Sequence, residues 1–361
     1  MRNLFLYLLF AFTMIALVAP GALGSPKIDK LLKEAERKGE YGGSLLVVKD
    51  GKVLYEGSVG FANREWSIRH TPDTRFRICS ITKQFTSVLV MRLVDSGKIG
   101  LDEPVSKYLP WLREETFSRI TIRHLLSGSS TLPFLPDPGF YTSTDERFTN
   151  YRYVIEKYLS GDLRGEPGRE FAYNNGDFIV AGAVIEELYS KPFDTVLKEE
   201  ILKPLEMRDT GMISSSRLVE RLASGYVFEA GAYRKEGFRS IENYGAAGAM
   251  YSTLRDMAKW NKALQNSVLI SRESTDVMFT SSPELGFVGL GSWIYDLKID
   301  DQKSVKLIER QGAIGGFSAL NLLAPNENLS ITFLGNVQTR TLFNTYTKNG
   351  LSYEVLKAIY S

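Results

Sequence analysis

The sequence predicts an α+β fold with two lobes. One lobe is an antiparallel sheet flanked by helices and built from both chain ends, and the other is an inserted, mainly helical lobe. Two observations predict this arrangement. Strand-like apolar runs occur near both ends of the chain, whereas the pattern of about residues 100–220 predicts mostly helices and loops. The 361 residues are enough to bury a large core, as one large domain or two lobes.

Composition and charge exclude several classes of protein. The chain is 43% hydrophobic and 24% charged, and 44 Lys and Arg against 42 Asp and Glu give a formal net charge of +2. Because no long run of one sign occurs, no nucleic-acid partner is expected. The single cysteine, Cys79, excludes an internal disulfide. The only two histidines, His70 and His124, are isolated from each other in the sequence. They argue against a His-based metal site and against a Ser-His-Asp triad.

The first 24 residues have the three parts of a secretory signal peptide. Arg2 precedes an apolar run from Leu4 to Ala19, Pro20-Gly21 ends that run, and Ala22-Leu23-Gly24 supplies small residues before a cut at Ser25. An uncleaved membrane anchor is the alternative, but the run is shorter than the roughly 20 residues of a full span. The sequence therefore predicts an exported protein, periplasmic or extracellular, that contacts the membrane only if this segment is retained.

The residues after the signal segment predict a helix, a hairpin and a second helix. Residues 25–42 form a charged helical lead-in. Apolar runs at 44–48 and 52–57 flank Asp50-Gly51, a strong signal for a tight turn. Helical periodicity over 81–96 then predicts a long helix, which ends at a glycine.

The C-terminal third predicts a capped helix and the remainder of the sheet. Ser252 or Thr253 can cap a helix that continues to about residue 264. Strand-like stretches then follow at 289–295, 305–309, 318–323 and 329–334. A last helix within 349–361 is expected to pack on the sheet, so that the main domain would span residues 43–348.

Ser80-Ile81-Thr82-Lys83 is the only S-x-x-K sequence in the chain. Residues three apart share one face of a helix, so the amine of Lys83 can reach the hydroxyl of Ser80. A serine is a poor nucleophile until a base takes its proton, and a desolvated lysine near another cation can be that base. Because serine and lysine are common, the motif alone is weak.

Tyr173-Asn174-Asn175 is the only Y-x-N sequence. A phenol beside two cations can lose its proton and relay one between the nucleophile and the leaving group. The amide of Asn175 can donate and accept, so it can orient Lys83 and hold a substrate amide. A turn after Pro167-Gly168 would explain the same residues without chemistry.

Arg310-Gln311-Gly312-Ala313 follows a predicted strand. Arg310 could bind a carboxylate through two hydrogen bonds, and the glycine lets a substrate approach the backbone closely. The backbone N–H of Ala313 could pair with that of Ser80 as an oxyanion hole. A glycine-rich hairpin is the simpler alternative, because two more glycines follow.

The three motifs together, in this order, resemble those of the β-lactamase-like serine hydrolases. That superfamily contains class C β-lactamases, D-alanyl-D-alanine carboxypeptidases, D-aminopeptidases and related esterases. The resemblance covers about residues 43–340 and implies a β-lactamase/transpeptidase-like fold. It extends over Gly97 to Pro110, Ile201 to Gly211, Ala247 to Trp260 and Gly312 to Phe317. Neither a G-x-S-x-G nor an H-E-x-x-H sequence is present, which argues against an α/β-hydrolase or a zinc protease.

The resemblance implies a role for each motif. Ser80 would be the acylated nucleophile, Lys83 its proton partner, and Tyr173 the general base and acid. The residues that bind or orient the substrate would be Asn175, Arg310, Gln311, Gly312 and Ala313. The last two would lie on an edge strand along the substrate, and neither metal nor cofactor is implied.

Two segments depart from the pattern of the family. Arg310-Gln311-Gly312 stands where the family has K-T-G or H-x-G. Arginine keeps the positive charge but is longer and does not titrate. Gly128 takes the place of a histidine in a segment that normally supports the floor of the active site. Both departures bear on β-lactamase activity more than on hydrolysis in general.

The resemblance implies two-step acyl transfer on an amide, β-lactam or ester carbonyl. The enzyme would be a penicillin-binding-type peptidase, a β-lactamase-like enzyme or an esterase. Its substrate would be a small molecule or peptide with a carbonyl and, in some of these cases, a carboxylate. The alternative is a catalytically weak or inactive protein on the same scaffold that binds cell-wall peptide or a partner. Intact Ser80, Lys83 and Tyr173 favour the enzyme.

Overall fold

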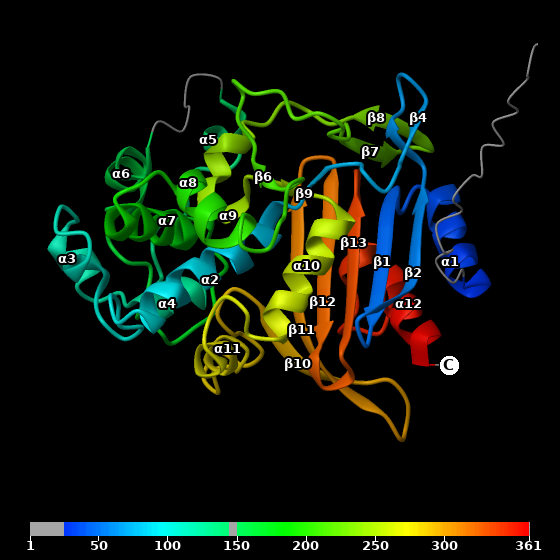
Figure 1. Cartoon of the computed structure of the whole chain (residues 1–361). Helices are drawn as coiled ribbons and strands as arrows, with labels where there is room; N and C mark the ends of the chain where they lie inside the picture. The colour runs from blue at the N-terminus through cyan, green and yellow to red at the C-terminus, as the bar shows by residue number, and fades with distance from the viewer. Residues whose placement is uncertain (1–24, 144–149, 361) are drawn as a thin grey trace, which may run out of the picture.

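The computed structural model describes residues 25–143 and 150–360. A six-stranded antiparallel sheet stands beside a mainly helical lobe (Figure 1). The strand order β10-β11-β12-β13-β1-β2 places the two N-terminal strands at one side of four C-terminal strands. The predicted α+β fold, with its sheet built from both chain ends, is therefore confirmed. The signal peptide predicted over residues 1–24 lies outside the described residues.

The strands of the large sheet are β1 (Gly43–Lys49), β2 (Lys52–Val59), β10 (Trp293–Lys298), β11 (Ser304–Ile314), β12 (Phe317–Ala324) and β13 (Leu329–Gly335). Asp50 and Gly51 join β1 to β2 with φ values of +52° and +72°, the left-handed conformation that a two-residue hairpin turn requires. The strand expected from residue 289 begins only at Trp293. The reason is a turn in which the N–H of Gly289 bonds to the carbonyl of Ser292.

Helices cover both faces of this sheet. On one face, α1 (Pro26–Arg37) and α12 (Gly350–Tyr360) bury a cluster of side chains that includes Phe333 of the sheet. On the other face lies α10 (Leu254–Gln265) (Figure 1), and the N-terminal end of α2 (Thr82–Asp95) reaches the sheet where Gln84 accepts a hydrogen bond from Asn321 of β12. Because both faces are covered, β12 and β13 are buried at every position and do not show a polar alternation.

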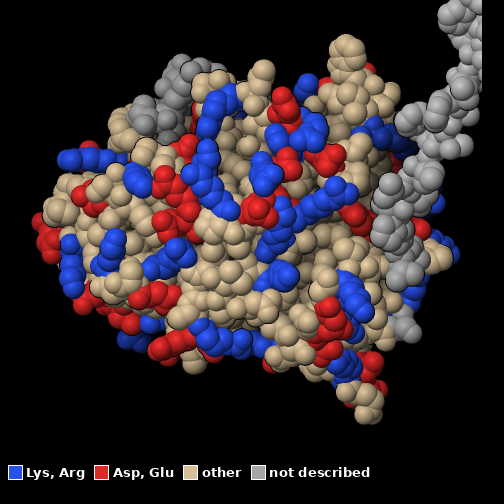
Figure 2. All heavy atoms as spheres, in the orientation of Figure 1, with Lys and Arg blue, Asp and Glu red and all other residues tan. Residues whose placement is uncertain are grey.

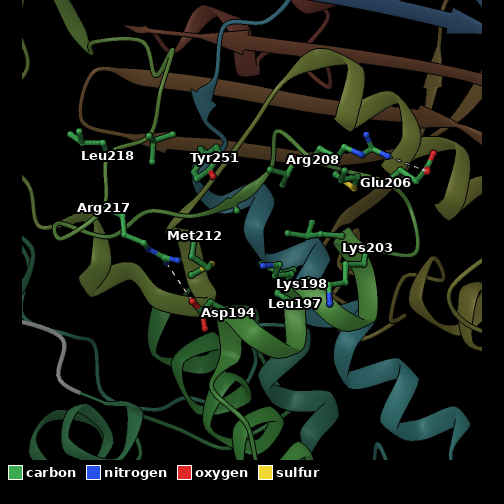
Figure 3. A pocket seen from close by; sticks show the side chains of 15 residues that line it. Asp194, Leu197, Lys198, Lys203, Glu206, Arg208, Met212, Arg217, Leu218 and Tyr251 are labelled. Atoms are coloured by element: carbon green, nitrogen blue, oxygen red, sulfur yellow. Dashed lines mark hydrogen bonds and ion pairs between the residues drawn. The ribbon is translucent and has the colours of Figure 1, made fainter.

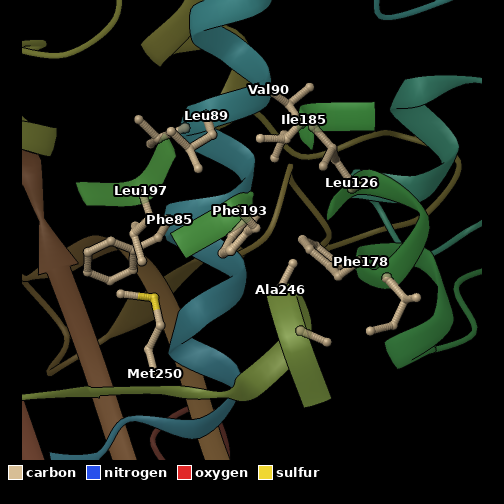
Figure 4. Packing of buried hydrophobic residues seen from close by; sticks show 14 of the residues in the cluster. Phe85, Leu89, Val90, Leu126, Phe178, Ile185, Phe193, Leu197, Ala246 and Met250 are labelled. Carbon is tan, nitrogen blue, oxygen red and sulfur yellow. The ribbon is translucent and has the colours of Figure 1, made fainter. Parts of the chain in front are cut away.

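The helical lobe is inserted between α2 and β9. Its helices and turns are η2 (Val105–Lys107), α3 (Glu114–Phe117), α4 (Ile122–Leu126), α5 (Gly139–Thr142), α6 (Tyr151–Val154), η3 (Ile155–Leu159), α7 (Asn175–Tyr189), α8 (Phe193–Leu197) and η4 (Lys198–Leu202). The longest, α7, packs against α2, α4 and α9 (Gly245–Gly248). Figure 4 shows side chains of this core, among them Phe85, Leu89 and Val90 of α2, Phe178 and Ile185 of α7, and Ala246 of α9. The lobe and one face of the sheet therefore share a hydrophobic core.

Several short elements complete the fold. They are β3 (Phe61–Asn63), β4 (Ile68–Arg69), β5 (Phe76–Arg77), η1 (Cys79–Ile81), β6 (Gly211–Met212), β7 (Tyr226–Glu229), β8 (Ala232–Lys235), η5 (Ile241–Tyr244), β9 (Met250–Ser252), α11 (Arg272–Met278), η6 (Pro325–Glu327), β14 (Val337–Gln338) and η7 (Thr341–Phe343). The order β5-β9-β6 makes a small sheet that fixes the chain just before Ser80. Thr253, and not Ser252, caps α10, because its hydroxyl accepts the N–H of Asp256.

The outer surface has no dominant charge on the face in view. Figure 2 shows Lys and Arg interspersed with Asp and Glu over the helical lobe and the sheet, as the small net charge of +2 leads one to expect. In the parts of the chain that the structure describes, none of the helices is both long and apolar enough to span a membrane.

Candidate active site

Ser80 lies where the chain passes from β5 into α2. It is the middle residue of η1, and the N–H of Ile78 bonds to the carbonyl of Met250 at 3.0 Å. Cys79, fully buried before it, has a φ of +51°, which costs a residue with a side chain about 1–2 kcal/mol. Surrounding packing thus holds Ser80 in a turn that the free chain would rarely adopt.

Lys83 is fully buried, and its amine lies among three oxygen atoms. Nζ is 3.3 Å from Oγ of Ser80, and it donates to Oδ1 of Asn175 at 2.8 Å and to the carbonyl of Ala247 at 2.7 Å. Burial lowers the pKa of Lys83 to about 8, and the positive charge of Arg310 adds to this although Tyr173 opposes it. Lys83 can therefore gain and lose a proton near neutral pH.

The hydroxyl of Tyr173 lies between Ser80 and Arg310. It donates to Oγ of Ser80 at 2.7 Å and accepts from Nη2 of Arg310 at 2.9 Å. Burial of this group raises the pKa of Tyr173, but the positive charges of Lys83 and Arg310 outweigh burial and lower the pKa to about 8. The residue as a whole is 40% exposed, so its ring is open to a ligand.

Arg310 is used by the protein itself. Only 4% of the residue is exposed, and its Nε donates to the carbonyl of Ser80 at 2.9 Å while Nη2 holds Tyr173. Its guanidinium also lies 5.1 Å from the ring centroid of Trp293. The structure thus places Arg310 where it fixes Ser80 and Tyr173, rather than open to a substrate carboxylate.

Asn175 and Gln311 differ in where their side chains lie. Asn175 opens α7, accepts from Lys83, and donates through Nδ2 to the hydroxyl of Tyr141 at 3.2 Å. Gln311 donates to the carboxylate of Glu309 and to the carbonyl of Phe343, which lie on the opposite face of β11 from Arg310. The structure therefore gathers the side chains of Ser80, Lys83, Tyr173, Asn175 and Arg310, and it directs that of Gln311 away.

β11 forms the other wall of the site, although it is not an edge strand along its whole length. β10 begins at Trp293, which pairs with Glu309 of β11. The end of β11 from Arg310 to Ile314 pairs with β12 alone, so its other side is a free edge. The edge strand expected from the sequence is thus confined to these last residues.

The free edge of β11 presents the backbone of Ala313. The two-residue turn after β11 pairs Ile314 with Phe317, so Ile314 and Gly312 direct their backbone groups toward β12, and Ala313 directs its groups the other way. Gly312 packs closely on the nucleophile turn: a Cβ there would lie 2.4 Å from the carbonyl of Ile78 and 3.0 Å from the N atom of Ser80. Only glycine lets β11 come so near to Ser80.

The departure at Gly128 is accommodated by Phe171. A Cβ at Gly128 would lie 3.0 Å from the Phe171 ring, and Gly128 has a φ of +65°. The N–H of Ala172 bonds to the carbonyl of Gly128 at 2.8 Å, which joins the two segments. An aromatic ring therefore packs against the backbone at this position.

Three residues near the site were not singled out from the sequence. Ala247 contributes only a carbonyl to Lys83, so no side-chain pattern could identify it. Asp177, fully buried in α7, accepts a hydrogen bond from Ser130, and burial raises its pKa to about 8. Its signal was available, as an acid at the start of an otherwise apolar helix. Trp293 had no signal beyond being aromatic.

Cavities also lie outside this cluster. One of about 620 Å³ is lined by α8, η4, β6 and β9, and Figure 3 shows Lys198, Lys203 and Tyr251 around it, with Arg217 paired to Asp194. Another, of about 870 Å³, lies between α4, α11 and the loop before β10. Ser80 lines neither, so the hydrogen bonds and shifted pKa values, rather than cavity size, identify the candidate site.

Comparisons with known proteins give matches over most of the chain. The β-lactamase family model matches residues 28–349. Protein flp of Staphylococcus aureus is 24% identical over 351 residues, which are 92% of this chain and 68% of that protein. Teichoic acid D-alanine hydrolase of Staphylococcus aureus is 27% identical over 250 residues, 69% of this chain and 60% of that protein.

A solved structure shows the same fold. The D-amino acid amidase from Ochrobactrum anthropi SV3, complexed with L-phenylalanine, superposes with a TM-score of 0.78 at 24% identity. The match covers 92% of this chain and 98% of the amidase. By contrast, this chain spans only about two thirds of the length of the two staphylococcal relatives, at 68% and 60%.

Proposed function

This chain belongs to the β-lactamase family, and from that premise we propose that it hydrolyses D-aminoacyl esters or amides through an acyl-enzyme on Ser80. One observation carries the proposal. Oγ of Ser80 lies 2.7 Å from the Tyr173 hydroxyl and 3.3 Å from Nζ of Lys83, so two groups with a pKa near 8 are in reach of its proton. We take the D-aminoacyl class of substrate from the names of two similar proteins, the teichoic acid D-alanine hydrolase and the D-amino acid amidase.

In the first half of the reaction, Ser80 attacks the substrate carbonyl. Tyr173, as the phenolate that Lys83 and Arg310 favour, takes the Ser80 proton while Oγ bonds to the carbonyl carbon. The N–H groups of Ser80 and Ala313 stabilise the oxyanion. Tyr173 then gives the proton to the leaving oxygen or nitrogen, the bond to the leaving group breaks, and the acyl group stays on Ser80.

In the second half, water releases the acyl group. Tyr173, again supported by Lys83, takes a proton from the water as its oxygen attacks the acyl carbon, and returns a proton to Oγ of Ser80. The products are a D-amino acid and an alcohol or amine. Asn175 keeps Lys83 in place and can hold the amide of a substrate.

The burial of Lys83, Arg310 and Tyr173 supports the role proposed for each of them. Lys83 and Arg310 are buried and touch protein groups, so they tune and position the reacting pair. Tyr173 alone of the three is substantially exposed, at 40%, and is the one that would contact the leaving group.

We also propose that the protein is exported and that residues 1–24 are removed. The support is the charged start, apolar run and small-residue cut site of that segment. N-terminal sequencing of the protein secreted from a bacterial host tests this: a mature chain that starts at Ser25 supports it, and a retained Met1 contradicts it.

The function is tested with matched substrates and a matched serine variant. Wild type, Ser80→Ala and Ser118→Ala, in which an exposed serine is changed, are each given D-alanine p-nitroanilide, p-nitrophenyl acetate and a fluorescent penicillin. We expect wild type and Ser118→Ala to turn over the D-alanyl or ester substrate, and Ser80→Ala to lose about a thousandfold or more.

Intact-mass spectrometry should show an acyl adduct in wild type and in Ser118→Ala, but not in Ser80→Ala. Full activity of Ser80→Ala would exclude Ser80 as the nucleophile. Penicillin labelling without any turnover would instead support the catalytically weak binding protein.

A further inference from the structure

Three aromatic side chains that have no role in the proposed reaction lie beside Tyr173. They are Phe171, two residues before Tyr173; Phe287, in the loop before β10; and Trp293, the first residue of β10. The ring centroids of Phe171 and Phe287 are 6.1 Å apart at 65°, and those of Phe287 and Trp293 are 6.4 Å apart at 60°. These edge-to-face contacts make one cluster, hereafter the aromatic cluster.

The aromatic cluster is open to solvent. Phe287 is 47% exposed, and Phe171 and Trp293 are half-buried. Large apolar side chains exposed together in a cleft, rather than scattered singly, indicate a surface that a ligand covers.

Arg310 connects the aromatic cluster to the reacting groups. Its guanidinium lies 5.1 Å from the centroid of Trp293 and 5.3 Å from that of Tyr173. Because Arg310 is only 4% exposed, it is buried beneath these rings. Phe171, Tyr173, Trp293 and Arg310 line one small hollow together with Gly128 and with Val288, the chain neighbour of Phe287.

The aromatic cluster is held in place before any ligand binds. Phe171 packs on the backbone at Gly128, where a Cβ would lie 3.0 Å from its ring. The N–H of Ile294 bonds to the carbonyl of Phe287 at 2.7 Å, which ties the loop to β10. A surface fixed in this way binds without a large cost in ordering.

The position of Tyr173 decides which part of a substrate meets the rings. In the proposed reaction Tyr173 gives a proton to the leaving atom, so that atom lies within hydrogen-bond distance of the Tyr173 hydroxyl. The carbonyl oxygen lies instead at the N–H groups of Ser80 and Ala313. A leaving group bonded to that atom can extend past Tyr173, on the side where Arg310 and Trp293 lie.

We propose that the aromatic cluster is a subsite for an aromatic or other flat apolar leaving group. The inference rests on the proposed function, since it uses Tyr173 as the donor to the leaving atom. It adds the substrate class: esters or amides of a D-amino acid whose alcohol or amine part carries an apolar ring.

Two esters that share an acyl group test the subsite. D-Alanine benzyl ester carries a ring on its leaving group, and D-alanine methyl ester does not. We expect wild type to prefer the benzyl ester in kcat/KM by about tenfold or more, through the apolar area that the ring buries. The effect should lie mainly in KM, because the contact exists in the ground state and the transition state alike.

Phe287→Ala removes one ring from an exposed position, where folding is not at risk. It should lower the preference for the benzyl ester about fivefold and leave the methyl ester unchanged. Phe287→Tyr, which keeps the ring, should retain the preference. Trp66→Ala, at a residue 79% exposed in the turn between β3 and β4, is the matched control and should change neither ester.

Benzyl alcohol gives a second readout that does not depend on the rate of cleavage. It should inhibit hydrolysis of the methyl ester competitively in wild type and several-fold more weakly in Phe287→Ala.

Four results would overturn the proposal. Equal kcat/KM for the two esters in wild type would do so, as would an unchanged preference in Phe287→Ala; in both cases Ser80-dependent hydrolysis, and thus the proposed function, still stands. If Phe287→Ala impairs D-phenylalanine methyl ester more than D-alanine benzyl ester, the rings serve the acyl side instead. If wild type cleaves neither these esters nor D-alanine p-nitroanilide, the proposed function fails and the subsite with it.

Discussion

Two groups of polar side chains are buried next to each other in this molecule, and they differ in charge. The charged group surrounds Ser80 and contains Lys83, Tyr173 and Arg310. The neutral group lies between α2, α10 and the sheet. Its members, all at most 1% exposed, are Gln84, Asn261, Asn321 and Thr332. Lys83 and Gln84 are adjacent residues of α2, so one helix supplies a member to each group.

The neutral group satisfies its own hydrogen bonds. Asn261 and Asn321 exchange bonds of 2.9 and 2.8 Å, Asn321 also donates to Gln84 at 3.2 Å, and Thr332 donates to Asn321 at 2.9 Å. None of these side chains titrates in the ordinary pH range. Such a network fixes how α2 and α10 sit on the sheet, because each shift would leave a buried group unpaired.

The charged group does the opposite. Lys83 and Tyr173 each have a pKa moved to about 8, so both gain or lose a proton near that pH. Burial of polar side chains alone therefore does not make an active site. Amides that are buried and hydrogen-bonded to one another hold the helices on the sheet. Two cations and a phenol that are buried together have shifted pKa values and can exchange protons.

The largest expected effect comes from the centre of the charged group. Lys83→Met should lower kcat/KM about a thousandfold or more, because Ser80 and Tyr173 lose the amine that supports proton transfer. The fold should persist, since the variant also removes the cost of burying an ammonium. Ester hydrolysis and circular dichroism measure the two effects.

Lys98→Met is the matched control, because Lys98 is exposed at the end of α2. It should behave as wild type. Near-normal activity of Lys83→Met would place the supporting base elsewhere.

The second effect belongs to the neutral group and should appear in stability. Asn321→Leu leaves the amides of Asn261 and Gln84 and the hydroxyl of Thr332 without this partner, which should cost about 2–3 kcal/mol of unfolding free energy. Urea unfolding measures it. The exposed Asn349→Leu should cost little. A shift in the pH profile of Asn321→Leu would mean that the two groups are not separate.

The third effect concerns the pH profile. In Arg310→Gln a positive charge that lowers the pKa of both Tyr173 and Lys83 is lost, so both pKa values rise. Because the deprotonated base is the active form, the rising limb of kcat/KM should move to higher pH. The rate at pH 7 should fall about tenfold to a hundredfold.

The exposed Arg255→Gln is the control for Arg310→Gln and should keep the wild-type profile. A limb that stays in place in Arg310→Gln, or moves to lower pH, would show that Arg310 does not set these pKa values.

The smallest effect comes from Asp177, an ionisable residue that lies outside the charged group. Burial raises its pKa in the folded state from 3.8 to about 8, so its contribution to stability is present at low pH and is lost as pH rises through that window. Asp177→Asn has no such loss. Relative to wild type it should therefore become more stable as pH rises from 5 to 8, by a few degrees in Tm.

Melting curves at several pH values, with activity measured alongside, test Asp177→Asn. A stability difference that does not change with pH would contradict the assigned shift. A large loss of activity would place Asp177 among the groups that support the reaction.

How much of this could be predicted from the sequence depends on the kind of signal. Asp50-Gly51 marked the first hairpin, and helical spacing placed Lys83 beside Ser80, because both are local rules of the backbone. The two-residue strands β5 and β6 have no periodicity to detect, so the small sheet before Ser80 was not predicted.

Within the site, long-range packing decided what remained unpredicted. That Arg310 would bond to the carbonyl of Ser80 and to Tyr173, and so not face a substrate, depends on residues more than 130 positions apart. By contrast, the direction of the Gln311 side chain follows from strand pleating, since neighbours of Arg310 must point to the opposite face.

The pairing of β1 with β13 has a consequence for the nascent chain. Gly43 pairs with Gly335, so β1 has no neighbour on that side until synthesis has passed residue 335. Contacts so distant in sequence form slowly. β11, which closes the wall beside Ser80, is also synthesised long after α2. A growing chain thus carries its serine without the wall or the arginine that act on it, and it acquires both only after β11 has been made, more than 200 residues later.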